Sequence, residues 1–461
     1  MADDTGTKQA DYPEIQAALN LYEARLAAEQ EHQKIPGFSA GVIFDQELVW
    51  ARGFGYADLA SKRPADAHTF YRVGSITKLF TATMLMQLRD AGKLHLDDPL
   101  AKYLPDFAIK SSFPDAKPPT FRGVVCHYSG LPTESPGDYW GTLEFPDLEA
   151  ALASLEDAEM AIPAFTEFKY SNMGIGMMGQ TLARIAGEPY RDYITNHILR
   201  PLGMNASGFE PRDNPAHATG YLAPGDEPEL APWPMIGFAE PAGALSSSVE
   251  EMAKFVSLQF RDGPAGGSQI LGGTSLREMH TPIAMTPDWE MGFGIGFGIR
   301  RSNGHVTFGH GGGIHGFTTQ VVALPDYKLG VIVFTNTSCN PDKLAELGLD
   351  ILVPVLDRYG ERAVERAERE ATTPEEWAVY VGCYQMEGLG TIEISLGKGC
   401  LIATMVRQPD FKLKLKPAGE HRFRSEEGRS NGEIVSFELD DSGKSIMLRL
   451  GSYPFARVEE E

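Results

Sequence analysis

The sequence predicts an α/β (α+β) fold in which helices and a helical subdomain flank an antiparallel sheet, followed by a small antiparallel β-barrel domain. Three observations carry this prediction. Strand patterns occur near the N-terminus and return after residue 290, whereas the residues between them favour short helices. The last part of the chain changes to short, evenly spaced strands, which are typical of an antiparallel barrel.

The N-terminal part is expected to provide a helix and a hairpin. Residues 1–11 are polar and indicate a flexible tail. The segments SAGVIF and LVWARGFG flank residues 45–47 and predict a β-hairpin. Before them, apolar residues recur at helical spacing up to about Glu31 and predict an amphipathic helix whose apolar positions are Ile15, Leu19, Tyr22 and Leu26.

The middle of the chain predicts helices, and strands return after it. A helix begins at Ser75 and ends near Gly92, and residues 93–240 are rich in proline, glycine and short helical patterns without strand pairs. After residue 290, GIGFGIR and HVTFGH form one expected hairpin, and FTTQVVAL and KLGVIVFTN form another. Because strands lie at both ends of the first ~350 residues, we expect one antiparallel sheet built from both ends.

The C-terminal residues predict a separate small domain. Residues 359–375 are highly charged and predict a helical linker. We therefore expect a first domain over 12–358, the linker over 359–375 and a barrel of about eight strands over 376–461. The strand segments that carry this expectation are YVGCYQ, TIEISL, CLIATM, FKLKL, HRFRS, EIVSFEL and SIMLRLG.

Composition limits the partners of the protein. Its 461 residues carry a formal net charge of −22, which argues against nucleic acids and anionic membranes as partners. No stretch reaches the ~18 apolar residues of a membrane span. The N-terminus lacks the basic and apolar regions of a signal peptide, so we expect a cytoplasmic protein, and a chain whose leader had been removed would look the same. The sequence leaves the oligomeric state open.

No metal or cofactor is expected. The four cysteines (Cys126, Cys339, Cys383 and Cys400) are far apart and show no C-x-x-C spacing. His305, His310 and His315 are five residues apart, whereas the histidines of a helical zinc motif are four apart. The G-x-S-x-G pattern at 428–432 lacks the strand before and the helix after that a nucleophile elbow requires.

One short motif stands out in the helix that begins at Ser75. In VGSITKLF, Ser75 precedes Lys78 by one helical turn inside an apolar stretch. An ordinary explanation is available, since a lysine can extend its ammonium to water and a serine often caps a helix. A second S-x-x-K, formed by Ser395 and Lys398, also lies in a sequence typical of a turn. The motif therefore needs partners before it indicates chemistry.

Two further elements can supply these partners. KYSNMG carries Tyr170 and Asn172, which an extended backbone places on the same side of the chain. FGHGGGIHGF ends an expected strand with His310 and three glycines, where a ligand can approach the backbone and its N–H groups. A buried tyrosine beside a turn asparagine, and a glycine-rich bend at a sheet edge, are the alternative explanations.

Together the three elements form a set suited to nucleophilic catalysis. A serine hydroxyl is a poor nucleophile until a base accepts its proton. A lysine among apolar groups has a lowered pKa, and at positions i and i+3 of a helix Ser75 and Lys78 share one face. Lys78 can then help a tyrosinate at position 170 to activate Ser75. The helix N-terminus and two backbone N–H groups can stabilise the oxyanion.

The order of these motifs resembles the serine β-lactamase and penicillin-binding-protein superfamily. The branch with class C β-lactamases, D-aminopeptidases, D,D-peptidases and β-lactamase-like esterases is the most similar. The resemblance covers about residues 15–355 and includes GKLHLDDPLAKYLP, HYSGLP and PAGALSSSVEEMAKF. The expected barrel resembles the lipocalin-like domain that is appended to some of these peptidases, where it covers or shapes the active site.

The resemblance implies a role for each motif residue. Ser75 would be the acyl-accepting nucleophile, Lys78 would tune it, and Tyr170 would be the general base. The N–H groups of Ser75 and Gly313 would form the oxyanion hole. The residues expected to bind or line the substrate are Asn172, His310, Gly312 and Gly313.

Two departures from the family pattern narrow the expected function. Many β-lactamases carry K-T-G where this chain has His310 and two glycines, and a histidine with a pKa near ~6.5 is mostly neutral at pH 7, so weaker penicillin recognition is expected. Tyr128 in HYSGLP stands where relatives often carry threonine, without a functional explanation. We therefore expect a serine hydrolase of a small ester, amide or short peptide, D-aminopeptidase-like or carboxylesterase-like. A β-lactamase, an acyltransferase and a non-catalytic penicillin sensor are the alternatives.

Overall fold

The chain divides into two compact units, Met1–Leu356 and Asp357–Glu461, which we call the sheet unit and the barrel unit. Helix α11 (Pro341–Glu370) runs through the region where the sequence placed the end of the first domain and the start of a linker. The expected tail, residues 1–11, lies outside the described residues. The structure is a computed structural model that describes residues 13–209, 215–262, 268–302, 304–370, 373–426 and 428–458.

A nine-stranded sheet forms the centre of the sheet unit, with the order β3-β2-β1-β11-β10-β9-β8-β7-β6. Its strands are β1 (Gly37–Phe44), β2 (Glu47–Asp58), β3 (Arg63–Pro64), β6 (Ala284–Met285), β7 (Met291–Phe293), β8 (Gly298–Ser302), β9 (His305–Ile314), β10 (Phe317–Leu324) and β11 (Leu329–Thr335). Neighbouring strands are antiparallel, and the N-terminal hairpin joins the C-terminal strands where β1 pairs with β11. The predicted sheet built from both ends of the chain is therefore confirmed.

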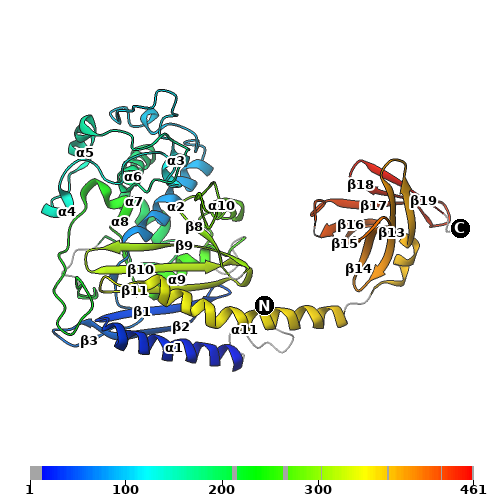
Figure 1. Cartoon of the computed structure of the whole chain (residues 1–461), viewed down its shortest axis with the longest axis horizontal. Coiled ribbons are helices and arrows are strands. Elements are labelled where there is room, and N and C mark those ends of the chain that lie inside the picture. The colour runs from blue at the N-terminus through cyan, green and yellow to red at the C-terminus, as the bar shows by residue number, and fades with distance from the viewer. Residues whose placement is uncertain are drawn as a thin grey trace. The chain divides into compact units, whose positions relative to one another are not determined.

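Helices cover both faces of this sheet and fill the segment between its two halves (Figure 1). The segment between residues 93 and 240 contains no named strand among its described residues, as the sequence predicted. A separate two-stranded pair consists of β4 (Tyr71–Arg72) and β5 (Ser246–Ser247). The helices of this unit before α11 are α1 (Pro13–Gln33), α2 (Thr77–Asp90), α3 (Phe121–Val125), α4 (Tyr139–Thr142), α5 (Leu148–Ser154), α6 (Asn172–Ala186), α7 (Tyr190–Ile194), α8 (Glu240–Gly243), α9 (Val249–Leu258) and α10 (Gly273–Met279).

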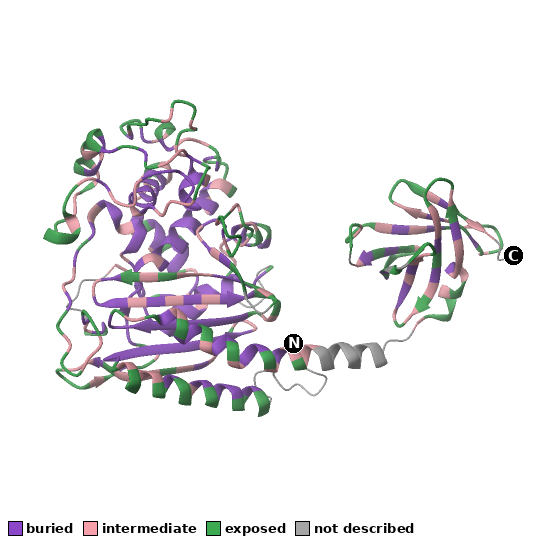
Figure 2. Ribbon diagram, viewed as in Figure 1, coloured by how far each residue is buried: buried purple, intermediate pink, exposed green. Residues whose placement is uncertain are grey.

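Close packing fixes the layers. All eight residues of β1 are buried. On one face, a Cβ added to Gly41 would lie 2.4 Å from Val249 of α9, so the glycine lets this helix approach the strand. On the other, Trp50 of β2 contacts Tyr22 of α1, whose hydroxyl donates to the carbonyl of Leu344 in α11 (2.9 Å). Buried residues accordingly concentrate in the central strands and in the helices above them (Figure 2).

The barrel unit is a closed barrel of eight antiparallel strands in sequential order, with β12 pairing with β19. The strands are β12 (Gly382–Met386), β13 (Gly390–Gly397), β14 (Cys400–Met405), β15 (Gln408–Gly419), β16 (Arg422–Glu426), β17 (Ile434–Leu439), β18 (Ser445–Leu450) and β19 (Tyr453–Val458). The expected strand number is confirmed, and β19 is the strand that the sequence segments did not include. Side chains such as Tyr384, Leu415 and Phe437 fill its core.

Two short motifs that resemble catalytic patterns, the second S-x-x-K and the G-x-S-x-G, lie in this barrel. Ser395 of the second S-x-x-K lies on β13, so its lysine is not one helical turn away. The G-x-S-x-G pattern lies between β16 and β17, as expected for a hairpin turn.

Across the described part of the chain, no helix combines the length and the apolar composition that a membrane span requires.

Candidate active site

Ser75 lies in the first turn of the helix that enters the core of the sheet unit. A 3₁₀ turn, η2 (Gly74–Ile76), leads directly into α2. Gly74 has φ +53°, a left-handed conformation that glycine adopts without strain, and it turns the chain from β4 into the helix. Ser75 is partly exposed, whereas Lys78, one turn later, is only 2% exposed. The helix N-terminus thus presents a hydroxyl at the surface and buries an amine behind it.

The Lys78 amine is surrounded by three oxygen atoms. Its Nζ lies 2.9 Å from Ser75 Oγ, 2.8 Å from Asn172 Oδ1 and 2.7 Å from the carbonyl oxygen of Ala242. The last two oxygens can only accept hydrogen bonds, so each takes one N–H of the amine. The third position faces Ser75, where an ammonium donates and a neutral amine accepts. Loss of one proton therefore turns Lys78 from a donor to Ser75 into an acceptor for its hydroxyl proton.

Burial brings that proton loss close to neutral pH. Removal of water from the Lys78 ammonium lowers its pKa from 10.5 to about 7, and the nearby Glu134 carboxylate opposes this shift. At pH 7 a large share of the amine is therefore neutral. The prediction that Lys78 is buried one turn from Ser75 with a lowered pKa agrees with this geometry.

Glycines in α6 bring the Ala242 carbonyl to the lysine. A Cβ added to Gly179 would lie 2.2 Å from Pro241, and one added to Gly176 would lie 3.1 Å from Ala239, so both glycines let the α8 segment approach α6. From the other side, Thr81 of α2 donates its hydroxyl to the Pro241 carbonyl (2.7 Å). The segment PAGAL is thereby fixed between two helices, with one carbonyl pointing at Lys78.

Tyr170 and Asn172 reach the same site from the start of α6. Ser171 between them is fully buried and caps the helix, because its Oγ accepts the Gly174 N–H (2.8 Å). Tyr170 and Asn172 both contact Lys78, and its Nζ lies 4.9 Å from the centre of the Tyr170 ring. Burial raises the pKa of Tyr170, and a hydrogen bond with Ser75 opposes that shift. The resting Tyr170 side chain is consequently a neutral phenol.

The glycine-rich strand β9 closes the site. A Cβ added to Gly312 would lie 2.0 Å from the Val73 carbonyl, and one added to Gly74 would lie 2.7 Å from the Gly313 nitrogen. Glycine is therefore required for β9 to lie against η2, and this contact brings the backbone of Gly313 next to that of Ser75. His310 faces Tyr170, with ring centroids 6.4 Å apart. Burial, together with the charge of Lys78, lowers the pKa of His310 to about 4, so this imidazole is neutral at pH 7.

The structure adds site residues that the motifs did not indicate. Glu134 Oε1 accepts a hydrogen bond from Asn172 Nδ2 (2.6 Å). His127, in the left-handed conformation (φ +60°), lies with its ring centroid 4.2 Å from that of Tyr170 and accepts the Ser171 N–H at Nδ1 (3.3 Å). Burial lowers the pKa of His127 well below its usual value. The phrase HYSGLP was the available signal for His127, because it directly precedes Tyr128.

Tyr128, for which the sequence offered no role, has a structural one. Its hydroxyl donates to the carbonyl of Met285 in β6, and its ring packs with Phe168 and Phe293 in a small apolar cluster. The side chain therefore ties the segment after α3 to the edge of the sheet.

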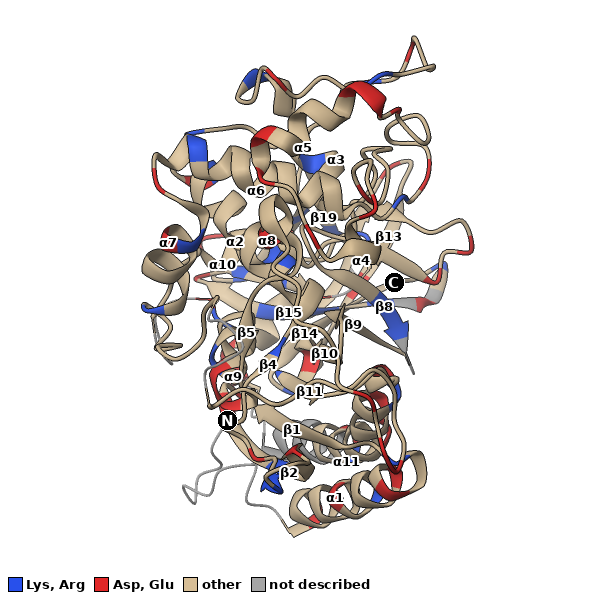
Figure 3. Ribbon diagram, turned by 90° about the vertical axis from the view of Figure 1, so that its left-hand side faces the viewer, with Lys and Arg blue, Asp and Glu red and all other residues tan. Residues whose placement is uncertain are grey.

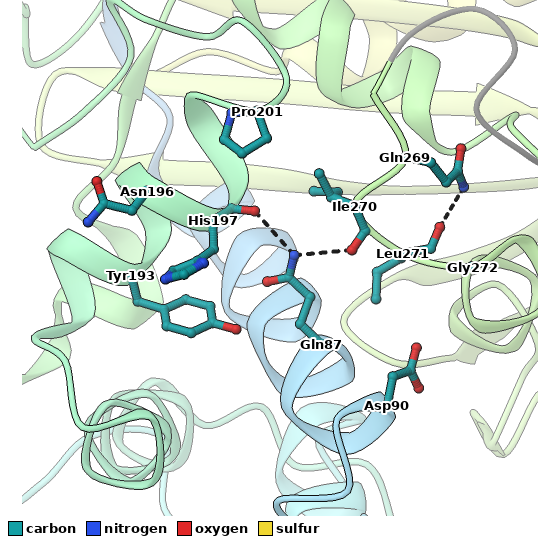
Figure 4. Close-up of a pocket in the computed structure, with 10 residues that line it drawn as sticks. All are labelled: Gln87, Asp90, Tyr193, Asn196, His197, Pro201, Gln269, Ile270, Leu271 and Gly272. Carbon is teal, nitrogen blue, oxygen red and sulfur yellow. Dashed lines mark hydrogen bonds between the residues drawn. The ribbon is translucent and has the colours of Figure 1, made fainter.

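A cavity of about 520 Å³ lies away from this site, at the other end of α2 (Figure 4). There, Gln87 Nε2 donates to the carbonyls of His197 and Ile270, 3.2 Å from each. None of the motif residues lines it.

Acidic segments lie on several elements of the sheet unit, including α1, α5 and α9 (Figure 3). Within the described ranges, no group of three or more His, Cys, Asp or Glu side chains could hold a metal ion.

An antiparallel sheet between helical layers, with a serine and a buried lysine one turn apart where η2 leads into α2, agrees with the resemblance that the sequence motifs indicated. The Beta-lactamase family model matches residues 23–353, more than half of the chain, and the protein belongs to this family. The predicted resemblance and fold class are thereby confirmed.

Relatives and solved structures agree with this assignment. Beta-lactamase-like protein 2 of Dictyostelium discoideum is 29% identical over 360 residues, which cover 75% of this chain and 64% of that protein. Putative penicillin-binding protein PbpX of Bacillus subtilis (strain 168) is 30% identical over 276 residues, which cover 58% of this chain and 65% of that protein. The chain thus spans less than two-thirds of the length of these curated relatives.

Solved structures extend the similarity to the fold. The octameric penicillin-binding protein homologue from Pyrococcus abyssi has a TM-score of 0.64 and 26% identity, and the match covers 95% of this chain and all of that one. A class C beta-lactamase has a TM-score of 0.62 at 22% identity, and the match covers 75% of this chain and 98% of that one.

Proposed function

We propose that the protein hydrolyses a small ester, amide or short peptide through an acyl-enzyme on Ser75. One observation carries the proposal: Lys78 Nζ lies 2.9 Å from Ser75 Oγ, and burial lowers the pKa of this amine to about 7. A neutral amine at that distance is a base within hydrogen-bond reach of the hydroxyl.

Acylation begins when Ser75 Oγ attacks the substrate carbonyl carbon and its proton passes to the neutral Lys78 amine. The N–H groups of Ser75 and Gly313 hold the resulting oxyanion, a contribution worth about 10²–10³ in rate per donor. The bond to the leaving group then breaks, and the Tyr170 phenol supplies the proton to that group. The family resemblance implied Tyr170 as the base at this step, whereas its neutral phenol and the direct Lys78–Ser75 contact favour Lys78.

Deacylation returns both protons. The Tyr170 phenolate accepts a proton from water as the water oxygen attacks the acyl carbon, and the Lys78 ammonium returns its proton to Ser75 Oγ as the acid is released. Atoms and charges balance over the cycle. The same acyl-enzyme would transfer its acyl group if an alcohol or amine replaced water.

A substrate panel tests the proposal. The wild-type protein and Ser75→Ala are compared on p-nitrophenyl acetate, on D- and L-alanine p-nitroanilide and on nitrocefin. We expect turnover of at least one ester or anilide that Ser75→Ala abolishes, and weak turnover of nitrocefin because His310 is neutral. Turnover that survives in Ser75→Ala, or a wild-type protein that cleaves nitrocefin best, would contradict the proposal.

A further inference from the structure

Glu134 is held at the edge of the site by the segment between α3 and α4. The Thr133 carbonyl accepts the N–H groups of Asn172 (2.8 Å) and Met173 (3.1 Å), which ties this segment to the start of α6. Glu134 Oε1 in turn accepts from Asn172 Nδ2 (2.6 Å), and the side chain is half-buried. No residue that the structure describes makes a hydrogen bond or an ion pair with the second oxygen, Oε2.

The described groups around this carboxylate leave Oε2 without a hydrogen bond or ion pair, although the Lys78 charge acts on the carboxylate at longer range. All three hydrogen-bond contacts of Lys78 Nζ are made with other oxygens. The imidazoles of His127 and His310 are neutral at pH 7, because burial lowers the pKa of each. The Lys169 ammonium donates to Thr133 Oγ1 (3.2 Å) instead of Glu134. An anion with one open oxygen therefore lies one amide group away from the Ser75–Lys78 pair.

Such a site discriminates among substrates by charge. A substrate carboxylate placed next to Oε2 would meet a like charge, which is unfavourable in a partly desolvated site. An ammonium on the acyl donor would gain a charge-assisted hydrogen bond from N⁺–H to Oε2. The Asn172 amide bridges Glu134 and Lys78, so Glu134 lies one side chain away from the Ser75–Lys78 pair, on the side where a group next to the reacting carbonyl would lie.

We propose that Glu134 binds the α-ammonium group of the acyl donor, so that the enzyme prefers substrates with a free amino group next to the scissile carbonyl. This inference rests on the proposed function, because it requires an acyl donor at Ser75. It names the substrate class of the same site as an aminoacyl ester or amide, or a peptide cleaved after its N-terminal residue.

Glu134→Gln is the variant that isolates the charge. A glutamine keeps an oxygen that accepts from Asn172 Nδ2, so the orientation of Asn172 and its contact with Lys78 are retained. Glu144→Gln is the matched control, since Glu144 is an exposed carboxylate ten residues further along the chain, just after α4. The substrates are alanine p-nitroanilide and N-acetylalanine p-nitroanilide, each in the D and L forms, together with p-nitrophenyl acetate at pH 7, below the amine pKa of ~8.

We expect the wild type to prefer the free amine, and Glu134→Gln to lower kcat/KM for it by about 10- to 100-fold. The value for the N-acetyl compound and the acetate ester should change by less than about 3-fold, and Glu144→Gln should change neither. A wild type without preference for the free amine overturns the inference. Equal losses on all substrates would also overturn it, since Glu134 would then act only by positioning Asn172. In both cases Ser75-dependent turnover of any of these substrates leaves the proposed function standing, whereas a wild type that turns over none of them refutes that function.

Discussion

Replacement of Lys78 by methionine should make the stability of the protein less dependent on pH. Lys78 is 2% exposed, and its pKa falls to about 7 in the folded chain from an ordinary 10.5 in the unfolded chain. Between these two values the unfolded state binds more protons than the folded state, so the stability of the wild type rises with pH there. Methionine has a similar length and no charge, so the variant lacks the contribution of the Lys78 proton to the pH dependence of the stability.

The size of the effect follows from the two pKa values. One pKa unit corresponds to about 1.4 kcal/mol. Between pH 7 and pH 9 the free energy of unfolding of the wild type should therefore rise by about 2 kcal/mol relative to Lys78→Met. The carbonyl of Ala242 and the Asn172 Oδ1 lose a donor in the variant, which costs about 1–3 kcal/mol for each. That cost does not depend on pH, so the change with pH isolates the proton on Lys78.

Urea unfolding followed by tryptophan fluorescence measures the difference, because four of the five tryptophans lie in the sheet unit (Trp50, Trp140, Trp233 and Trp289). Both proteins are unfolded at pH 7, 8 and 9, and the barrel contributes equally to each. The pKa of His310 is about 4, so this group does not titrate in the window. A stability difference that stays constant from pH 7 to pH 9 would refute the lowered pKa of Lys78 and with it the base that we assign.

Three further predictions concern the site and the domains. Lys78→Ala and Tyr170→Phe should be far from additive in a double-mutant cycle of kcat, because the two side chains move protons in the same acylation and deacylation steps at Ser75. Losses that simply multiply would contradict this coupling. His310→Lys should raise kcat/KM for nitrocefin relative to p-nitrophenyl acetate by about 5- to 150-fold, because lysine places a cation where a neutral imidazole stands. If the ratio of the two kcat/KM values did not change, this position would not set selectivity. A chain that ends at Tyr359 should still unfold cooperatively and keep its ester turnover, because the last buried residue of α11 in the described part of the sheet unit is Leu356. An insoluble or molten product would argue against a separable barrel.

Much of the fold could be predicted because its elements have local signatures. Apolar residues at helical spacing gave α1, and two strand segments around a short turn gave β1 and β2. In the barrel, seven strand segments were visible, but β19 was not. Its sequence, YPFARV, contains a proline, which lowers the strand signal, and the strand is nevertheless completed by pairing with β12 and β18.

The motif residues of the site could also be found in the sequence, since each has a recognisable side chain. The atoms that complete the site could not. The Ala242 carbonyl belongs to the backbone, and it reaches Lys78 only because Gly176 and Gly179 let α8 approach α6. Glu134 lies 38 residues before Asn172, and nothing in its local sequence indicates that pairing. Contacts of this kind depend on how distant elements pack, which spacing along the chain does not encode.

The most direct test of the account is the location of the acyl group. The wild-type protein, Ser75→Ala and Ser395→Ala are each treated with a fluorophosphonate, and the adduct is followed by intact mass and peptide mapping. Ser395 is the matched control because it heads the second S-x-x-K but lies on strand β13. We predict one adduct on Ser75 in the wild type and in Ser395→Ala, and none in Ser75→Ala. An adduct that persists in Ser75→Ala, or that maps to another serine, would contradict the central claim.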